Sequence, residues 1–383
     1  MDEPANGFKF LEELRKKTGK QDHSFQKLQY YLGNKAREKG APVSGKFELT
    51  PLCNFNCKMC YIHLTEKQFK GQTILPAETW KDLIYQAWKA GMVTSTLTGG
   101  ECLTYPGFEE LYLYLHSLGC EVSVLTNGYL LDEHRIQFFK NHLPAAVQVT
   151  LYGWNDDVYE RVTGQRAFTT VVNNIKRALE EGIPVYVAIT PNKYLGEDLL
   201  KTIQVAKELC KTVIINSVFT TPREETGRSE QQDDIETELY IRAYKYYIKL
   251  EGHETFEIRD GALPPCGGPC HETSEYGLQC GGGRSSFTID WKGTMMPCSD
   301  LTMIRSYPLR DGFTAAWTKI NQEANRWPRV PECSGCAYER VCHHCAANVL
   351  RYAEPGRLPV GLCERTRELV RNGIVHLPEC DNL

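Results

Sequence analysis

The chain has 383 residues, of which 42% are hydrophobic and 24% charged, an ordinary globular balance that suits one large domain and a smaller one. Its formal net charge of −4 leaves no basic surplus to neutralise phosphates, which argues against a nucleic-acid partner. No signal-peptide pattern opens the chain and no apolar stretch is long enough to span a bilayer, so we expect a cytoplasmic protein without a membrane partner.

The chain contains sixteen cysteines. Disulfides are rare in a reducing cytosol, so metal-binding or catalytic roles are the better expectation. The distribution favours metal, because three cysteines lie within 53–60 and most of the others fall between Cys266 and Cys363.

Residues 1–45 are polar, with amphipathic helical patterns around Phe8–Leu14 and Phe25–Ala36. Strands and helices then alternate along the chain. Strands are predicted at Lys46–Leu52, Val93–Thr98, Glu121–Thr126, Ala146–Tyr152, Pro184–Thr190 and Val213–Phe219. Helices are predicted at Glu78–Ala90, Phe108–Leu118, Asp132–Asn141, Thr169–Glu181, Glu197–Leu209 and Ile235–Leu250.

Regular alternation of this kind predicts an α/β fold with a parallel sheet covered by helices. The pattern alone permits either a partly closed barrel or an open, doubly wound sheet, and in both the functional loops follow the carboxyl ends of strands. From about Gly261 prolines, glycines and cysteines replace the alternation. We therefore expect three parts: a helical extension at 1–45, a core at 46–255 and a small, loop-rich cysteine domain at 262–383.

The first cysteine cluster, CNFNCKMC, places Cys53, Cys57 and Cys60 on one loop after the first strand. Soft thiolates suit iron–sulfur clusters, and three of them leave one iron of a four-iron cluster open for chemistry. The alternative is a structural zinc loop.

This loop, followed after the second strand by Leu97-Thr98-Gly99-Gly100-Glu101, resembles the radical SAM superfamily, whose enzymes use S-adenosylmethionine (SAM). The resemblance covers about Lys46 to Leu250. It implies a (β/α)6 partial TIM-type barrel and a [4Fe–4S] cluster whose open iron is chelated by SAM.

The resemblance also implies a set of SAM contacts. Gly99 and Gly100 let the backbone approach a ligand closely, and the Glu101 carboxylate accepts hydrogen bonds from an ammonium group. Weaker candidates are Asn127 and Thr150 for the ribose, Arg161 for the SAM carboxylate, and Tyr61 for the adenine. The non-functional interpretations are that Asn127 forms a turn, Arg161 is a surface charge and Tyr61 is a core residue.

The C-terminal cysteines resemble the SPASM extension of radical SAM proteins, which binds auxiliary [4Fe–4S] clusters. One departure is that His343-His344 leaves two residues, rather than three, before Cys345. The resemblance implies one cluster on Cys280, Cys298 and Cys345, with Cys270, Cys266 or no residue as the fourth ligand. It implies a second cluster on Cys333, Cys336, Cys342 and Cys363. Zinc-ribbon sites are the alternative.

The resemblance implies that a 5′-deoxyadenosyl radical removes a hydrogen atom from the substrate, with a flavodoxin or ferredoxin as electron donor. We favour a ribosomal-peptide maturase with a peptide or protein substrate. Tyr152, Thr190 and Asn216 are candidates to line its pocket, although core packing is the more common role for such positions. Sulfatase maturation is less favoured, because Ser299 follows Cys298 where those relatives carry an Asp; Asp300 is a weak candidate base. Cofactor or tetrapyrrole modification and a non-catalytic iron–sulfur or zinc redox sensor remain alternatives.

Overall fold

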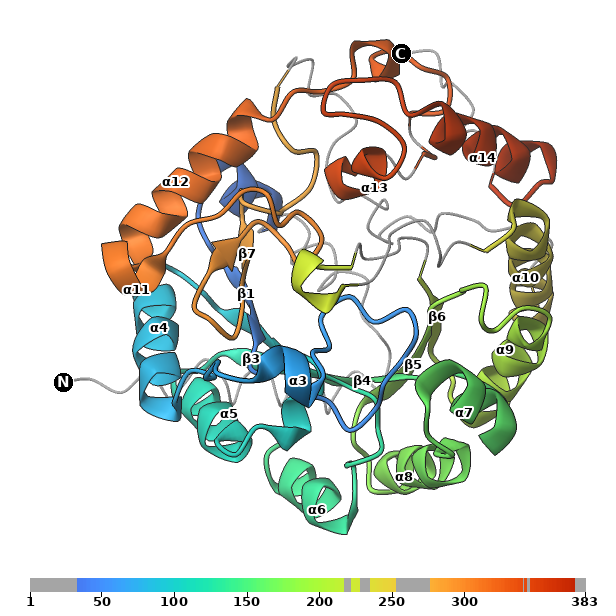
Figure 1. Cartoon of the computed structure of the whole chain (residues 1–383), viewed down its shortest axis with the longest axis horizontal. Helices are drawn as coiled ribbons and strands as arrows, with labels where there is room; N and C mark the ends of the chain where they lie inside the picture. Colours follow the sequence, from blue (N-terminus) through green and yellow to red (C-terminus); the bar gives the residue numbers. More distant parts are fainter. Residues whose placement is uncertain are drawn as a thin grey trace, which may run out of the picture.

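The computed structural model describes residues 33–216, 222–227, 235–252, 276–339, 341–342 and 345–375 (Figure 1). The predicted helix at Phe8–Leu14, most of the one at Phe25–Ala36, and the candidate ligands Cys266 and Cys270 lie outside these residues. The predicted boundary between the core and the cysteine domain, 255–262, also lies outside them.

A single sheet of eight strands, in the order β6-β5-β4-β3-β2-β1-β7-β8, forms the centre of the described structure. The strands are β1 (Ser44–Glu48), β2 (Thr94–Thr98), β3 (Glu121–Thr126), β4 (Ala146–Thr150), β5 (Val185–Ile189), β6 (Val213–Ile215), β7 (Ser286–Ile289) and β8 (Met295–Met296). Strands β1 to β6 are parallel neighbours in chain order, as the sequence predicts. Strand β7 pairs in parallel with β1, and β8 pairs antiparallel with β7.

Most of the helices form an arc around the outside of the curved sheet (Figure 1). Those of the first part are α3 (Glu66–Phe69), α4 (Ala77–Lys89), α5 (Phe108–Ser117), α6 (Glu133–Asn141), α7 (Asp156–Thr163), α8 (Phe168–Glu180), α9 (Asp198–Leu209) and α10 (Thr237–Leu250). The later ones are α11 (Pro308–Asp311), α12 (Phe313–Arg326), α13 (Ala346–Leu350) and α14 (Val360–Arg371). This one-sided arrangement is a partial TIM-type barrel, which decides between the two architectures that the sequence left open.

The strands show why the sheet curves around a polar interior. In β1, Phe47 points outward and packs edge-on against Trp80 of α4, with ring centroids 5.8 Å apart. Lys46 and Glu48 alternate with it and therefore face inward. The inner faces of the later strands likewise carry Gln148 and Thr150. Polar inward positions make these strands less uniformly apolar than a sheet buried on both faces would be.

The sequence analysis did not predict two described helices of the first part, the four-residue α3 and the longer α7. Asn155 caps the amino end of α7, with the side-chain oxygen accepting a hydrogen bond from Val158 N at 2.8 Å. Gly164 ends it in the left-handed conformation, with φ 76°. The helix matters for the site because its last turn holds the cysteine loop.

No helix in the described ranges combines the length and the apolar character that a membrane crossing requires.

Candidate active site

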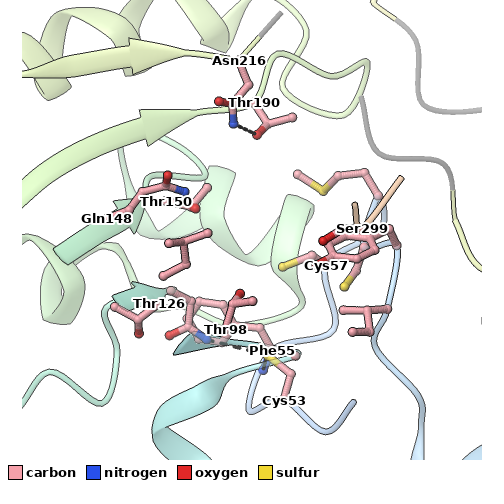
Figure 2. A pocket seen from close by; sticks show the side chains of 18 of the residues that line it. Cys53, Phe55, Cys57, Thr98, Thr126, Gln148, Thr150, Thr190, Asn216 and Ser299 are labelled. Atoms are coloured by element: carbon pink, nitrogen blue, oxygen red, sulfur yellow. Dashed lines mark hydrogen bonds between the residues drawn. The ribbon is translucent and has the colours of Figure 1, made fainter. Parts of the chain in front are cut away.

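A cavity of about 360 Å³ opens inside the barrel, at the carboxyl ends of the strands (Figure 2). The loops after β1, β2 and β3 form one part of its wall, and inward side chains of β4 together with the residues directly after β5 and β6 form another. The candidates of the sequence analysis that line it are Cys53, Cys57, Cys60, Tyr61, Gly99, Gly100, Asn127, Thr150, Tyr152, Thr190, Asn216 and Asp300. The site thus gathers residues from six strands and from the C-terminal region.

The loop with the three cysteines is fixed by its own backbone. Asn56 N donates to Thr163 O at 2.9 Å, and Lys58 N donates to Val162 O at 3.0 Å, so the loop is docked on the end of α7. Burial, with a smaller contribution from the Glu101 carboxylate, raises the pKa of Cys53 to about 12. A metal that binds this thiol would have to displace its proton.

The three thiols of the loop line the same cavity. Among the described residues, no three Cys, His, Asp or Glu side chains lie close enough together to hold one metal ion. A tetrahedral zinc ion would need its sulfur ligands about 3.8 Å apart. A four-iron cluster spreads its ligands over several metal atoms, so three thiols that share one cavity wall fit it better.

Gly99 and Gly100 let the β2 loop approach the β1 loop. A Cβ atom on Gly99 would lie 2.5 Å from Thr50 O, and φ is +148° there. A Cβ atom on Gly100 would lie 2.8 Å from Pro51 O. Both glycines also line the cavity. The sequence analysis explained them by approach to a ligand; the structure adds that close packing of one backbone on another already demands them.

The carboxylate of Glu101 is buried and accepts hydrogen bonds from the protein itself. Oε1 accepts from Leu103 N at 3.0 Å and from Thr126 Oγ1 at 2.8 Å, and Oε2 accepts from Asn127 N at 2.8 Å. Burial raises the pKa of Glu101, and these hydrogen bonds oppose that shift. The side chain ties the ends of β2 and β3 together and is not among the cavity-lining residues, so its predicted contact with an ammonium group is not supported.

Asn127 and Tyr61 lie against the cysteines. Asn127 Nδ2 donates to Asn54 Oδ1 at 2.8 Å and lies 3.7 Å from the sulfur of Cys53. Tyr61 donates its hydroxyl to Glu48 Oε1 at 3.2 Å. Both side chains reach the cavity, so each is positioned for the ligand contact predicted for it, which stays a prediction.

The predicted role of Arg161 is wrong for this structure. Its guanidinium pairs with Asp198 at the start of α9 and donates through Nε to Tyr194 O at 3.1 Å. The side chain is nearly half exposed and does not line the cavity. The reason is the docking of α7, which turns this position toward α9 and away from the barrel interior.

A buried ion pair beside the cysteine loop was not predicted. Glu48 is fully buried and pairs with Arg223, at 2.5 Å from Nη2 to Oε2. Arg223 also covers the ring of Tyr61, with Cζ 5.6 Å from the ring centroid, and its backbone N donates to Tyr61 O at 2.9 Å. The pair fixes the residue that follows Cys60. Sequence offers no signal for it, because 175 residues separate the two partners.

Ser299 and Asp300 bring the C-terminal region into the cavity. Asp300 Oδ1 and Ser299 Oγ are buried and have no hydrogen-bond partner among the described residues. An unpaired buried acceptor is costly, so these atoms have capacity for a ligand or a proton.

Some of the C-terminal cysteines that the sequence analysis groups together also interact electrostatically in the structure. The thiol of Cys333 interacts electrostatically with those of Cys336, Cys342 and Cys363, which supports their being one ligand set. Cys298 interacts in the same way with Cys280. Cys345 caps α13, its sulfur accepting from Asn348 N at 3.4 Å. Burial raises the pKa of Cys298 and of Cys333 to about 12.

Several cavity residues were missed, among them Lys46, Gln148, Thr98 and Arg351. Lys46 and Gln148 could have been found from the strand alternation, because polar residues at inward positions of a barrel strand point to its lumen.

Comparison with known proteins identifies the family. Residues 47–209 match the model of the radical SAM superfamily. The AdoMet-dependent heme synthase of Methanosarcina barkeri is 25% identical over 337 residues, which cover 82% of this chain and 94% of that protein. The sporulation killing factor maturation protein SkfB of Bacillus subtilis is 29% identical over 164 residues, which cover 43% of this chain but only 39% of the relative.

Solved structures agree with the fold. Streptococcus suis SuiB bound to S-adenosylmethionine superposes with a TM-score of 0.63 at 16% identity, covering 94% of this chain and 88% of that one. SuiB bound to its precursor peptide SuiA gives a TM-score of 0.64 at 15% identity, covering 95% and 82%. Taken with the cysteine loop and the paired glycines, the match to the family model identifies residues 47–209 as a radical SAM domain.

Proposed function

We propose that this enzyme modifies a peptide, forming a crosslink or oxidising a side chain, with Cys53, Cys57 and Cys60 as ligands of a [4Fe–4S] cluster and SAM bound beside it. When bound, the cluster and SAM would supply a 5′-deoxyadenosyl radical able to remove a hydrogen atom from an unactivated C–H bond. The observation that carries the proposal is that these three thiols, the paired glycines and Asn127 line one cavity.

The chain's own residues have three tasks in this proposal. Asn127, Thr150 and Tyr61 hold the nucleoside part of SAM at the cavity wall, and the buried Glu48–Arg223 pair keeps Tyr61 in place. The barrel excludes water from the reacting centre. Asp300 takes up a proton at its unpartnered Oδ1 as the substrate is oxidised.

The cysteines beyond residue 276 complete the proposal. We assign Cys333, Cys336, Cys342 and Cys363 to one auxiliary [4Fe–4S] cluster. Cys280, Cys298 and Cys345 belong to another, with Cys270 as a candidate fourth ligand. Cys298 lies near Asp300, so a cluster bound by Cys298 would be suitably placed to accept the electron that substrate oxidation releases. An external flavodoxin or ferredoxin would supply the electron for SAM cleavage. The likeness to SkfB and the fold shared with the peptide-bound SuiB support a peptide substrate.

Modification of a tetrapyrrole is the second candidate. The observation that favours it is the match to a heme synthase, which extends over 82% of this chain and 94% of the relative. The match to SkfB covers less than half of either chain. The longer alignment extends into the C-terminal region, which contributes Ser299 and Asp300 to the cavity.

The central assignment is tested by anaerobic SAM cleavage. Wild-type enzyme with reconstituted clusters should produce 5′-deoxyadenosine, and the triple variant Cys53→Ala/Cys57→Ala/Cys60→Ala should produce none, because the cleaving cluster has lost all its protein ligands. The matched control, Cys120→Ala, changes a buried cysteine outside the cavity and should retain cleavage. Cleavage by the triple variant would refute the assignment.

The substrate is tested in the same preparations. The enzyme is co-expressed with a short peptide encoded beside its gene, and the peptide's mass is measured. Loss of two hydrogens, with intact enzyme only, supports crosslinking or dehydrogenation. An unmodified peptide together with a modified carboxylate-bearing porphyrin would decide for the second candidate.

A further inference from the structure

Lys46 places a positive charge in the cavity, deeper in the barrel than the loops that carry the cysteines and the paired glycines. It is the middle residue of β1 and is in register with Thr96 of β2, whereas the next inward residue, Glu48, is in register with Thr98 at the carboxyl end. Thr98 lines the cavity and Thr96 does not. Lys46 therefore starts one layer deeper than the loops that carry the cysteines and glycines, and its long side chain reaches the cavity from its floor.

This ammonium group has no acidic partner in the part of the chain that the structure describes. Glu48, on the same face of β1, is already engaged by Arg223 and Tyr61. Asp300 enters the cavity from the C-terminal region, beside Tyr61 and Cys298. A partly buried cation without a counter-charge is unfavourable unless a ligand supplies one.

Gln148 offers a second donor in the same cavity. Its side-chain oxygen accepts a hydrogen bond from the Tyr186 hydroxyl at 2.9 Å. This leaves the amide nitrogen as the end that faces the cavity, next to Thr150 (Figure 2). Asn216, in contrast, uses its amide nitrogen on Thr190 Oγ1 at 2.9 Å. A cation, an amide N–H and a hydroxyl that share one cavity are the donors a carboxylate needs.

We propose that Lys46 and Gln148 bind a carboxylate group of the substrate and thereby select acidic substrates. The inference rests on the proposed function in one respect, namely that this cavity is the substrate site. The carboxylate can belong to an acidic side chain of a peptide or to a side chain of a tetrapyrrole, and both have the same chemistry. Lys46 acts as a positioning and specificity-determining residue, since it places the neighbouring C–H bonds near the cysteine loop.

The test is equilibrium binding without reductant, so that it is independent of turnover. Two pairs of probes are titrated into the SAM-loaded enzyme. One is a porphyrin with free carboxylate side chains and its methyl ester, and the other is the neighbouring peptide and a version with each Asp and Glu replaced by Asn and Gln. In one pair the acid should bind about tenfold more tightly than its neutral form. Which pair shows the preference identifies the source of the carboxylate.

Lys46→Met should abolish that preference and leave binding of the neutral form unchanged. Lys46→Arg should keep most of it, and Gln148→Leu should reduce it. Lys46→Gln replaces Lys46→Met if the latter does not fold. The matched control is Lys89→Met on the exposed side of α4, which should behave as wild type.

Three results would overturn the inference: equal binding of acid and neutral forms by the wild type in both pairs, a preference that survives in Lys46→Met, or an equal loss of SAM affinity in that variant. The last would mean that the lysine contacts the cofactor. Failure of the proposed function itself would be seen separately, as SAM cleavage by the triple cysteine variant.

Discussion

At the scale of single residues, the site requires two neighbouring positions that have no side chain. Gly99 and Gly100 have no side chains because the β2 loop passes against the backbone of Thr50 to Leu52. Gly100 N also donates to Thr50 O at 2.6 Å, so this approach is hydrogen-bonded as well as close. Two neighbouring strand ends are thereby locked together where the cysteine loop begins.

Gly100→Ala should therefore damage both stability and the site. The new Cβ would meet the backbone at Pro51 and Leu52, which cannot move aside as a flexible side chain would. We expect a loss of about 1–3 kcal/mol in the free energy of unfolding and a large fall in SAM cleavage. Urea denaturation followed by circular dichroism measures the first, and 5′-deoxyadenosine formation the second.

The control for this change is Gly33→Ala, where an added Cβ would meet nothing within 4 Å. Its activity should match the wild type, and its unfolding free energy should be equal or up to about 1 kcal/mol higher, because Gly33 lies in a helix. A Gly100→Ala enzyme that is as stable and as active as this control would show that the close approach of the two loops is dispensable.

At the scale of elements, the sequence predicted the strands well, because each carries its own apolar pattern and turn signals. All six strands of the barrel were placed correctly to within a few residues. Helix α7 was missed because its segment is short and rich in polar residues. The prediction for Arg161 failed in the same helix, because the direction in which a helical side chain points depends on how the helix packs against the rest of the protein. The thiols and Asn127 were predictable from local motifs, whereas the Glu48–Arg223 pair exists only in three dimensions.

That pair leads to a prediction about β1 and the segment 222–227. Arg223→Met leaves the fully buried Glu48 without its cation, which should cost about 3–5 kcal/mol of unfolding free energy. The double variant Glu48→Gln/Arg223→Met removes both charges and should recover much of this loss. The quantity to measure is the midpoint and slope of urea unfolding for the single and double variants.

Arg166→Met is the matched control, because its pairs with Asp157 and Glu160 are exposed and should contribute little. If Arg223→Met were no more destabilising than this control, the buried pair would not be holding Tyr61 and β1 in place.

At the scale of the whole molecule, the C-terminal region is joined to the barrel and does not stand beside it as a separate body. Strand β7 extends the core sheet by pairing with β1, and β8 extends it further. Helix α12 adds side-chain contacts: Trp317 Nε1 donates to Gly40 O at 2.8 Å. This continuity explains how Ser299 and Asp300 can reach a cavity otherwise built from the barrel.

The packing of the C-terminal region on the barrel is best tested at Phe287. Its ring lies between Phe47 of β1, at 6.0 Å between centroids, and Phe313 and Trp317 of α12, at 5.2 and 6.1 Å. Because the ring is 1% exposed, Phe287→Ala should cost about 3–5 kcal/mol. The exposed Met303, changed to Ala, serves as control and should stay within about 0.5 kcal/mol of the wild type.

The number of transitions in the urea unfolding curve is the more decisive test of this prediction. If the sheet makes barrel and C-terminal region one cooperative unit, tryptophan fluorescence and circular dichroism should report a single, coincident transition in wild type and in Phe287→Ala, shifted to lower urea in the variant. Trp80 reports on the barrel and Trp317 on the C-terminal region, so removing either as Trp→Phe assigns the signal. Two separate transitions would mean that the strands pair without coupling the stability of the two parts, and that Asp300 can leave the cavity while the barrel stays folded.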